Sequence, residues 1–138
     1  PLRVLTADDP PTNRKVAELM LSGVAEVVSV VDGQEAVDAA FASLFDIILM
    51  DMQMPVMDGL TAVQMIRAST SPCRNVPIVM MTANAMREHV EASRTAGADV
   101  HLAKPITAQT LFAAMNEATE RAVPDHQNTR HTENSAQI

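Results

Sequence analysis

The sequence predicts an α/β domain in which five β-α repeats build one doubly wound, five-stranded parallel sheet with helices on both faces. Three observations predict this fold. Short apolar runs recur five times along the 138-residue chain. The segments between the runs carry apolar residues at helical spacing. Two of the runs are unbroken rather than alternating, as is typical of central parallel strands covered on both faces.

The five apolar runs are the predicted strands, and polar or Pro-containing residues follow each of them. They are Leu2 to Leu5, Val27 to Val31, Ile47 to Met50, Ile78 to Met81 and, more weakly, Val100 to Leu102. The third and fourth runs are the unbroken ones, so we expect them at the centre of the sheet.

The predicted helices lie between these runs and after the last of them, where apolar residues recur every three or four positions. The helical sets are Val16, Leu19 and Met20; Val37, Ala40, Phe41 and Leu44; Leu60, Val63 and Ile66; and Leu111, Phe112, Met115 and Ala118. Gly23 and Gly97 lie where helices are expected to end, since glycine readily adopts the left-handed conformation of a C-cap. Asp58 is predicted to cap the helix that opens at Gly59.

The composition changes after Arg121, and residues 124–138 are polar and nearly without apolar side chains. Such a segment cannot bury enough surface to order itself. We therefore expect one folded domain over residues 1–123 and a disordered tail over 124–138. The chain begins at Pro1 without an initiator Met, so we expect it to be cut from something longer.

Composition and charge exclude several classes of function. The net charge is −7, the ten basic residues are scattered, and three Phe with no Tyr or Trp leave few rings for stacking. Nucleic acid and carbohydrate are therefore poor ligands. The lone Cys73 forms no internal disulfide, and no run reaches the length of a membrane span. We expect a soluble, cytoplasmic domain without direct membrane contact.

Polar side chains gather where the predicted strands end. Ligands of an open parallel sheet bind beyond the carboxyl ends of its strands. The residues at those ends are Asp8 and Asp9, Asp51, Thr82, and Lys104 followed by Pro105. Three carboxylates, a hydroxyl and an ammonium are thus expected at one rim.

These groups favour phosphoryl transfer with a metal ion. Two carboxylates at about 4 Å repel by about 4 kcal/mol at an effective dielectric of about 20, so positive charge is needed. Lys104 supplies one charge, and Mg²⁺ suits the oxygen ligands that remain, whereas the absence of a Cys/His cluster argues against zinc. Asp51 would attack as a carboxylate nucleophile, and Thr82 would hydrogen-bond to a phosphoryl oxygen.

Four motifs occur in order along the chain. They are Ala7-Asp8-Asp9, Leu49-Met50-Asp51-Met52-Gln53-Met54-Pro55-Val56-Met57-Asp58-Gly59, Met81-Thr82-Ala83 and Ala103-Lys104-Pro105-Ile106. Together they resemble the receiver domains of two-component response regulators, over residues 2 to about 122. The resemblance implies a flavodoxin-like fold and a phosphorelay function. The domain would catalyse its own aspartyl phosphorylation and dephosphorylation, then switch conformation or pass the phosphoryl group onward.

The resemblance also implies roles for single residues. Asp51 would be the phosphoacceptor, and Thr82 and Lys104 would contact the phosphoryl group. Asp9, Asp51 and the backbone carbonyl of Gln53 would ligate Mg²⁺ directly, with Asp8 acting largely through water. The Lys104-Pro105 bond is expected to be cis by likeness to the family.

Two positions depart from the family pattern. Receivers of this type commonly carry Asn after the acidic pair, whereas this chain has Pro10, which removes a backbone donor beside the metal loop. His101 stands where many members place an aromatic residue that rotates as a switch, and a His there would add pH dependence. Pro10 would affect the start of the first helix, and His101 would affect how the switch reports phosphorylation.

The partners implied are a histidine kinase or a histidine phosphotransfer protein. The segment from Asp8 to Arg14, the missing Met and the tail resemble the last domain of a hybrid sensor histidine kinase, with a stand-alone receiver as the alternative. Such a kinase would place this domain in the cytoplasmic part of a membrane-bound sensor.

Three competing functions stand beside the phosphorelay. A receiver-like interaction module would keep the fold and signal without phosphorylation. A Mg²⁺-dependent hydrolase of the haloacid-dehalogenase kind would need a second Asp where this chain has Gln53. A nucleotide-binding protein would need a G-x-G-x-x-G or G-x-x-x-x-G-K-[ST] loop, and neither occurs.

Overall fold

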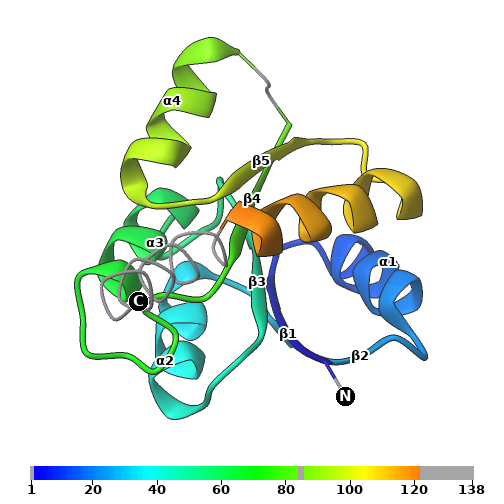
Figure 1. Cartoon of the computed structure of the whole chain (residues 1–138), viewed down its shortest axis with the longest axis horizontal. Coiled ribbons are helices and arrows are strands. Elements are labelled where there is room, and N and C mark those ends of the chain that lie inside the picture. Colours follow the sequence, from blue (N-terminus) through cyan, green and yellow to red (C-terminus); the bar gives the residue numbers. More distant parts are fainter. Residues whose placement is uncertain (1, 84–85, 122–138) are drawn as a thin grey trace, which may run out of the picture.

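The computed structural model describes residues 2–83 and 86–121. Within them, five parallel strands form one sheet in the order β2-β1-β3-β4-β5, which confirms the predicted fold (Figure 1). The elements are β1 (Leu2–Ala7), α1 (Pro11–Leu21), β2 (Ala25–Val30), α2 (Gly33–Ala42), β3 (Ile47–Asp51), α3 (Gly59–Arg67), β4 (Ile78–Thr82), α4 (Arg87–Ala96) and β5 (Val100–Ala103). A last helix follows over residues 108–121, which we call the C-terminal helix. The predicted tail at 124–138 lies outside the described residues.

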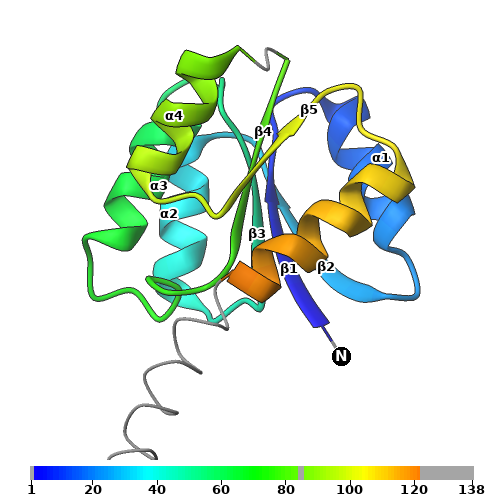
Figure 2. The same cartoon turned by 45° about the horizontal axis from the view of Figure 1, so that its top comes forward.

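The sheet is the middle layer, and helices cover it on both faces. Figures 1 and 2 show α1 and the C-terminal helix on one side and α2, α3 and α4 on the other. Two apolar clusters follow this division. One joins the sheet to α2 and α3 around Ile48 and Ile66, and the other joins it to α1 and the C-terminal helix around Leu49 and Leu111.

Every residue of β3 and β4 is buried, as expected from their unbroken apolar runs. The side chains of a strand alternate between its two faces. Ile48 and Met50 therefore lie in one cluster while Ile47 and Leu49 lie in the other. A strand with helices on both faces has no polar face, so its sequence does not alternate.

The strand order reverses at β1, and this reversal positions the site. From β1 the chain crosses to β2 through α1 on one face, and from β2 it returns to β3 through α2 on the other. The loops after β1 and β3 therefore diverge to opposite faces. A crevice opens between the carboxyl ends of these two strands, where ligands of such sheets bind.

The ends of the helices follow the predicted chemistry. Asp58 is the N-cap of α3, and its carboxylate accepts a hydrogen bond from the backbone N–H of Thr61 at 2.8 Å. Gly97 ends α4 with φ at 118°, and Gly23 follows α1 with φ at 80°. Pro10 is the N-cap of α1. Its lack of a backbone N–H costs the helix no hydrogen bond, because the N–H groups at the start of a helix have no partner within the helix.

Several residues of the predicted apolar helical sets are exposed, including Val16 and Leu19 of α1 and Phe112 of the C-terminal helix. The set predicted for α2 also differs from the structure. Phe41 and Leu44 were expected to face the core, but they are 44% and 58% exposed. Helix α2 ends at Ala42, so Leu44 falls outside it, and the buried aromatic ring is Phe45 at 3% exposure. The helical spacing continued past the true end of the helix because the following loop is also apolar. In the part of the chain that the structure describes, no helix is both long and apolar enough to cross a membrane.

Candidate functional site

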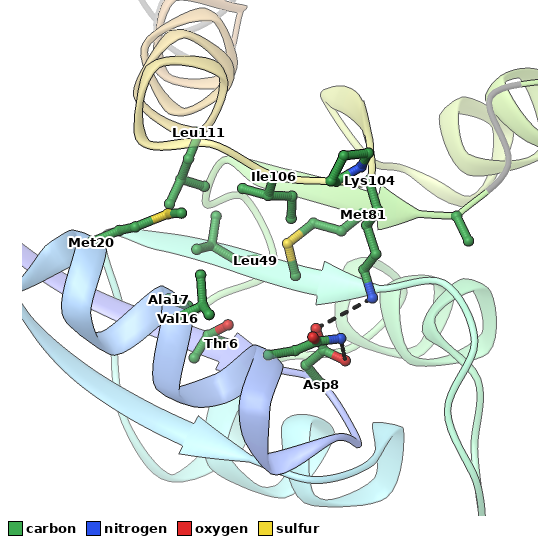
Figure 3. Close-up of a pocket in the computed structure, with 13 residues that line it drawn as sticks. Thr6, Asp8, Val16, Ala17, Met20, Leu49, Met81, Lys104, Ile106 and Leu111 are labelled. Atoms are coloured by element: carbon green, nitrogen blue, oxygen red, sulfur yellow. Dashed lines mark hydrogen bonds and ion pairs between the residues drawn. The ribbon is translucent and has the colours of Figure 1, made fainter.

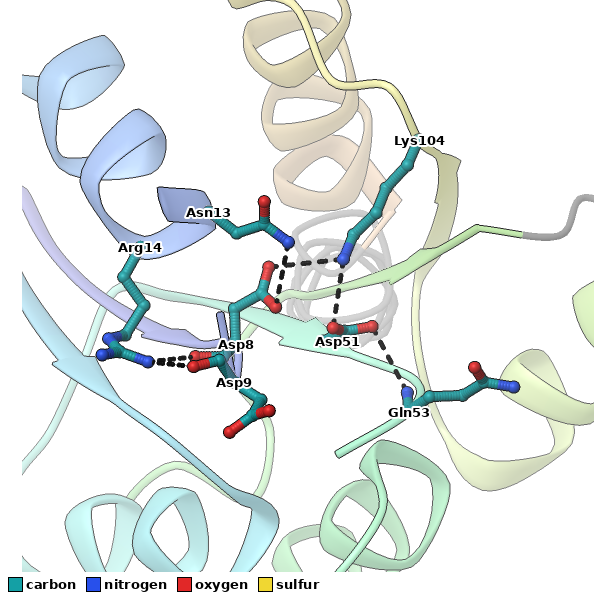
Figure 4. A network of polar contacts seen from close by, with 7 residues as sticks. All are labelled: Asp8, Asp9, Asn13, Arg14, Asp51, Gln53 and Lys104. Atoms are coloured by element: carbon teal, nitrogen blue, oxygen red, sulfur yellow. Dashed lines mark hydrogen bonds and ion pairs between the residues drawn. The ribbon is translucent and has the colours of Figure 1, made fainter. Parts of the chain in front are cut away.

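Three charged side chains meet at the crevice between β1 and β3. The Lys104 ammonium lies 3.1 Å from Oδ2 of Asp51 and 3.4 Å from Oδ2 of Asp8 (Figure 4). The Asp8 and Asp51 side chains are 4% and 8% exposed, and the Lys104 side chain is 22% exposed. Two nearly buried carboxylates therefore share one ammonium.

Backbone contacts and the first turn of α1 hold Asp8 in place. Its N–H donates to the Val30 carbonyl at 3.1 Å, which extends the β1-β2 pairing past the end of the strand. The Asn13 side chain donates to Oδ1 of Asp8 at 3.4 Å. The Arg14 guanidinium donates to the carbonyl oxygens of both Asp8 and Asp9. The loop is thus tied from both sides.

Pro10 is compatible with this arrangement. Its carbonyl accepts hydrogen bonds from the N–H groups of Asn13 and Arg14 at 3.1 and 3.2 Å, so the helix starts regularly. The geometry of the first helix, which the departure at Pro10 put in question, is that of an ordinary helix with proline before its first turn.

A close backbone approach fixes Asp51. The N–H of Met52 donates to the Met81 carbonyl at 2.8 Å, and the N–H of Gly59 donates to the Met52 carbonyl at 2.9 Å. A Cβ at Gly59 would lie 2.1 Å from the carbonyl oxygen of Asp51, so only glycine fits. Oδ1 of Asp51 accepts a hydrogen bond from the N–H of Gln53 at 3.3 Å. The carboxylate is held at both oxygens.

Strands β4 and β5 position Lys104. Its N–H donates to the carbonyl of Thr82 at 2.7 Å, and the Lys104-Pro105 peptide bond is cis. Thr82 is 2% exposed at the end of β4. The lysine and the hydroxyl of Thr82 therefore belong to adjacent strand ends, next to the end of β3 that carries Asp51.

The surroundings of Asp8 disfavour its charge. Its pKa is raised to about 6, first because the carboxyl is buried and second because the Asp51 carboxylate lies beside it. The Lys104 ammonium and the Asn13 amide lower the pKa but do not offset the burial. The pair carries more negative charge than Lys104 neutralises, so a further cation is favoured here.

The chemistry of the donors fits a magnesium ion. Mg²⁺ is bound in proteins through one or two carboxylates together with other oxygen atoms, and Asp8 and Asp51 offer carboxylates side by side. Gln53 lies two residues after Asp51 along the loop, with its side chain pointing away from the site (Figure 4). The described residues contain no group of three or more His, Cys, Asp or Glu side chains already gathered around a metal position.

Asp9 differs from its predicted neighbours. It is exposed, and Figure 4 shows its carboxylate pointing away from those of Asp8 and Asp51. Its side chain would have to turn about its own bonds to share a ligand with Asp51. The structure thus brings together Asp8, Asp51 and Lys104, with Thr82 at the next strand end, and leaves the Asp9 side chain outside the group.

His101 lies away from this group on the edge strand β5. Its Nδ1 is 3.1 Å from Oγ of Ser93, a buried residue of α4. This contact joins α4 to the sheet at the position where an aromatic switch was expected.

Sequence reasoning assigned no site role to Asn13 and Arg14. Both hold the acidic loop from the first turn of α1. The signal that could have found them is their spacing, since a helix that starts two residues after Asp9 returns its first turn over that loop.

The chain matches the model of the response regulator receiver domain over residues 4–116. A sensor protein GacS of Pseudomonas syringae pv. syringae is 40% identical over 134 residues, which cover 91% of this chain and 15% of that protein. The signal transduction histidine-protein kinase BarA of Shigella flexneri is 38% identical, over 80% of this chain and 12% of its own length. The chain therefore spans less than a sixth of the kinases that it matches.

Solved structures agree with the sequence relatives. The receiver domain of a sensor histidine kinase from Pseudomonas aeruginosa has 37% identity and a TM-score of 0.78, with 86% of this chain and 98% of that one covered; its structure has a magnesium ion coordinated in the active site cleft. The chemotaxis protein CheY4 of Vibrio cholerae has 30% identity and a TM-score of 0.79, with 85% and 98% covered. The chain belongs to the response regulator receiver domain family of two-component phosphorelay systems.

Proposed function

We propose that Asp51 accepts a phosphoryl group from a phosphohistidine of a histidine kinase or a histidine phosphotransfer protein. One observation carries the proposal: the Asp51 carboxylate lies at the end of the buried central strand, 3.1 Å from the Lys104 ammonium. A lysine at this position can pair with the Asp51 carboxylate and then with the oxygens of a phosphoryl group attached to it. The domain would then act by catalysing its own modification.

The transfer makes one bond and breaks one. A carboxylate oxygen of Asp51 forms a bond to phosphorus while the bond from phosphorus to the imidazole nitrogen breaks, and that nitrogen keeps the electron pair. Charge spreads over the three equatorial oxygens of the transferring group. Lys104 would stabilise that charge, and Oδ1 of Asp51 is oriented by the N–H of Gln53.

Asp8, Asp51 and the carbonyl of Gln53 are the groups that would hold Mg²⁺, with Asp9 joining after its side chain turns. The bound ion supplies positive charge for the phosphoryl oxygens. The raised pKa of Asp8 supports this assignment, because two crowded carboxylates favour binding of a cation. The solved receiver with magnesium in its active site cleft supports it by likeness.

Thr82 and His101 are proposed to turn the modification into a conformational change. Thr82 lies at the strand end beside Asp51, where its hydroxyl would hydrogen-bond to a phosphoryl oxygen and draw the following loop inward. His101 pairs with Ser93 of α4 in place of an aromatic switch. A shift of α4 would therefore alter this contact, which gives the surface around α4 a role in output.

The larger setting is also a proposal. We propose that residues 1–123 form the receiver unit and that 124–138 are a polar tail. Relatives such as GacS and BarA are much longer kinases, so we propose that this domain works in or with a hybrid sensor histidine kinase on the cytoplasmic side of the membrane. Its acidic charge supports a protein partner rather than a nucleic acid.

Intact-mass spectrometry after incubation with acetyl phosphate tests the acceptor. The wild-type chain should gain about 80 Da, the mass of one phosphoryl group, only when Mg²⁺ is present. Asp51→Asn should gain nothing. Asp58→Asn is the matched control, because Asp58 caps α3 in the same loop and Asn keeps the cap, so it should gain the same mass as the wild type.

A wild-type chain that gains no mass, beside another receiver that does, would refute the proposal. The function would then be that of an interaction module which signals without phosphorylation. Mass gain by Asp51→Asn equal to that of the wild type would refute the assignment of the acceptor alone.

A further inference from the structure

A pocket of about 520 Å³ lies between α1 and the C-terminal helix, beside the phosphoryl site. Its walls are mostly apolar, and Figure 3 shows side chains from both helices and from the sheet pointing into it. Among them are Val16, Met20, Leu49, Met81, Ile106 and Leu111. Pockets that bind small molecules span roughly 300 to 1,000 Å³ and are mostly apolar with a few placed polar groups.

Among the described residues that line this pocket, one buried side-chain polar atom has no hydrogen-bond partner. Thr6 lies on β1, its side chain shares the sheet face of Val4, and it is 0% exposed. Its Oγ1 is fully buried and has no hydrogen-bond partner within the described residues. Thr6 lines the pocket, and Figure 3 shows its hydroxyl directed toward that space. Buried hydroxyls are nearly always hydrogen-bonded to protein or to ordered water, so this hydroxyl is available to a partner from outside the chain.

The charges at the mouth of the pocket restrict that partner. Asp8 and Lys104 line the mouth, and the Lys104 ammonium is already shared by the carboxylates of Asp8 and Asp51. An anionic ligand would meet the Asp8 carboxylate and a single ammonium that is already paired with two carboxylates. A neutral ligand is therefore favoured.

We propose that this pocket binds a small, neutral, largely apolar molecule through one hydrogen-bonding group that meets Oγ1 of Thr6. The pocket shares Asp8 and Lys104 with the proposed phosphoryl site, and binding to it requires no phosphorylation. A ligand there would also touch Asp8 and Lys104, so it would slow phosphorylation of Asp51. This second effect rests on the proposed function.

The test uses N-phenyl-1-naphthylamine, a neutral probe with an aromatic body and one N–H group. Its fluorescence rises when it leaves water, and it is titrated into the full chain with no phosphodonor. Two methionines of the pocket, Met20 and Met81, serve as reporters through their methyl NMR signals. Met65 is 42% exposed on α3, on the other side of the sheet, and serves as the internal control. We expect saturable binding that shifts the signals of Met20 and Met81 and leaves that of Met65 in place.

Three variants locate the probe. Ala17 lines the pocket from α1, so Ala17→Phe should fill it and weaken binding at least about tenfold. Ala42→Phe is the matched control, since Ala42 is exposed on α2, and it should leave the affinity unchanged. Thr6→Val should weaken binding roughly 2- to 12-fold through loss of one hydrogen bond. For 1-phenylnaphthalene, which has the same aromatic body and no N–H, Thr6→Val should leave the binding affinity unchanged.

The inference is overturned if no saturable binding occurs, if Met65 shifts as much as Met20, or if Ala17→Phe binds as tightly as the wild type. The same samples distinguish failure of this inference from failure of the proposed function. Probe binding without a mass gain from acetyl phosphate would support the pocket and refute phosphorylation, and a mass gain without probe binding would do the reverse.

Discussion

Replacement of Asp8 by Asn should stabilise the folded domain at neutral pH. The Asp8 side chain is 4% exposed and lies beside the Asp51 carboxylate, and its pKa is raised from 3.8 to about 6. Between these two pH values the folded chain holds a proton that the unfolded chain releases. The free energy of unfolding therefore falls as the pH rises through this window. The amide of Asn removes the charge and keeps the shape.

The pKa difference sets the size of the effect. Each pKa unit corresponds to about 1.4 kcal/mol, so an ionised Asp8 costs the folded chain about 3 kcal/mol above pH 6. Loss of the contact with Lys104 offsets little, because Lys104 keeps Asp51 at 3.1 Å. The stability of Asp8→Asn relative to the wild type should therefore rise by about 2 kcal/mol between about pH 4 and about pH 7, since part of the change already occurs below pH 4.

Urea unfolding of both proteins at the two pH values, with EDTA present, measures this change. Titration of the other carboxylates is common to both proteins and cancels in the difference. Asp38→Asn is the matched control, because Asp38 is exposed on α2 and should change stability by less than about 0.5 kcal/mol at either pH. A difference between Asp8→Asn and the wild type that stays constant with pH, or that falls as the pH rises, would refute the reasoning.

Three further substitutions test how the loops are built. Gly59→Ala should cost about 3 kcal/mol of unfolding free energy and reduce phosphorylation, because the new methyl group would meet the backbone of Asp51 at 2.1 Å; urea unfolding and mass gain measure the two effects. Val56→Asn should stabilise by about 1 kcal/mol, because Val56 is 82% exposed with φ at 68°, a conformation that Asn tolerates and valine does not. Arg67→Lys should destabilise by about 3 kcal/mol, because its guanidinium bonds to three carbonyls and to Asp99, and one ammonium cannot replace that set; thermal and urea unfolding report the loss.

Matched controls separate these causes from general effects of substitution. Gly23→Asn has open space for its side chain and a φ that Asn accepts, so it should cost less than about 1 kcal/mol. Val24→Asn changes an exposed valine without positive φ and should not stabilise the domain. Arg87→Lys, at an exposed pair with Glu91, should stay within about 0.5 kcal/mol. Equal effects in a substitution and its control would refute the corresponding explanation.

The sheet and its rim were predictable because they depend on patterns along the chain. An unbroken apolar run such as Ile47 to Met50 has few alternatives to a buried strand, and the residue after such a run must lie at the rim. Asp8, Asp51 and Lys104 therefore meet as expected. Periodicity failed at Leu44, which lies beyond the end of α2, because apolar spacing alone cannot show where a helix ends.

Other features depend on side-chain geometry that no spacing encodes. Asp8 and Asp9 are adjacent and chemically alike, yet one is buried and the other is exposed and points away. Their difference arises from the direction in which the chain leaves β1. The pocket beside Thr6 depends likewise on the volumes of side chains from two helices far apart in sequence.

The ion pair between Lys104 and Asp8 spans 96 positions of the chain, from the end of the first strand to the end of the last. Synthesis delivers Asp51, the proposed acceptor, well before Lys104, the lysine proposed to act with it. A nascent, truncated or unfolded chain contains every acidic residue of the site but no assembled site. Under the proposed chemistry, a domain could be phosphorylated only after its fifth strand has paired with the sheet. Incompletely folded chains would therefore carry no signal.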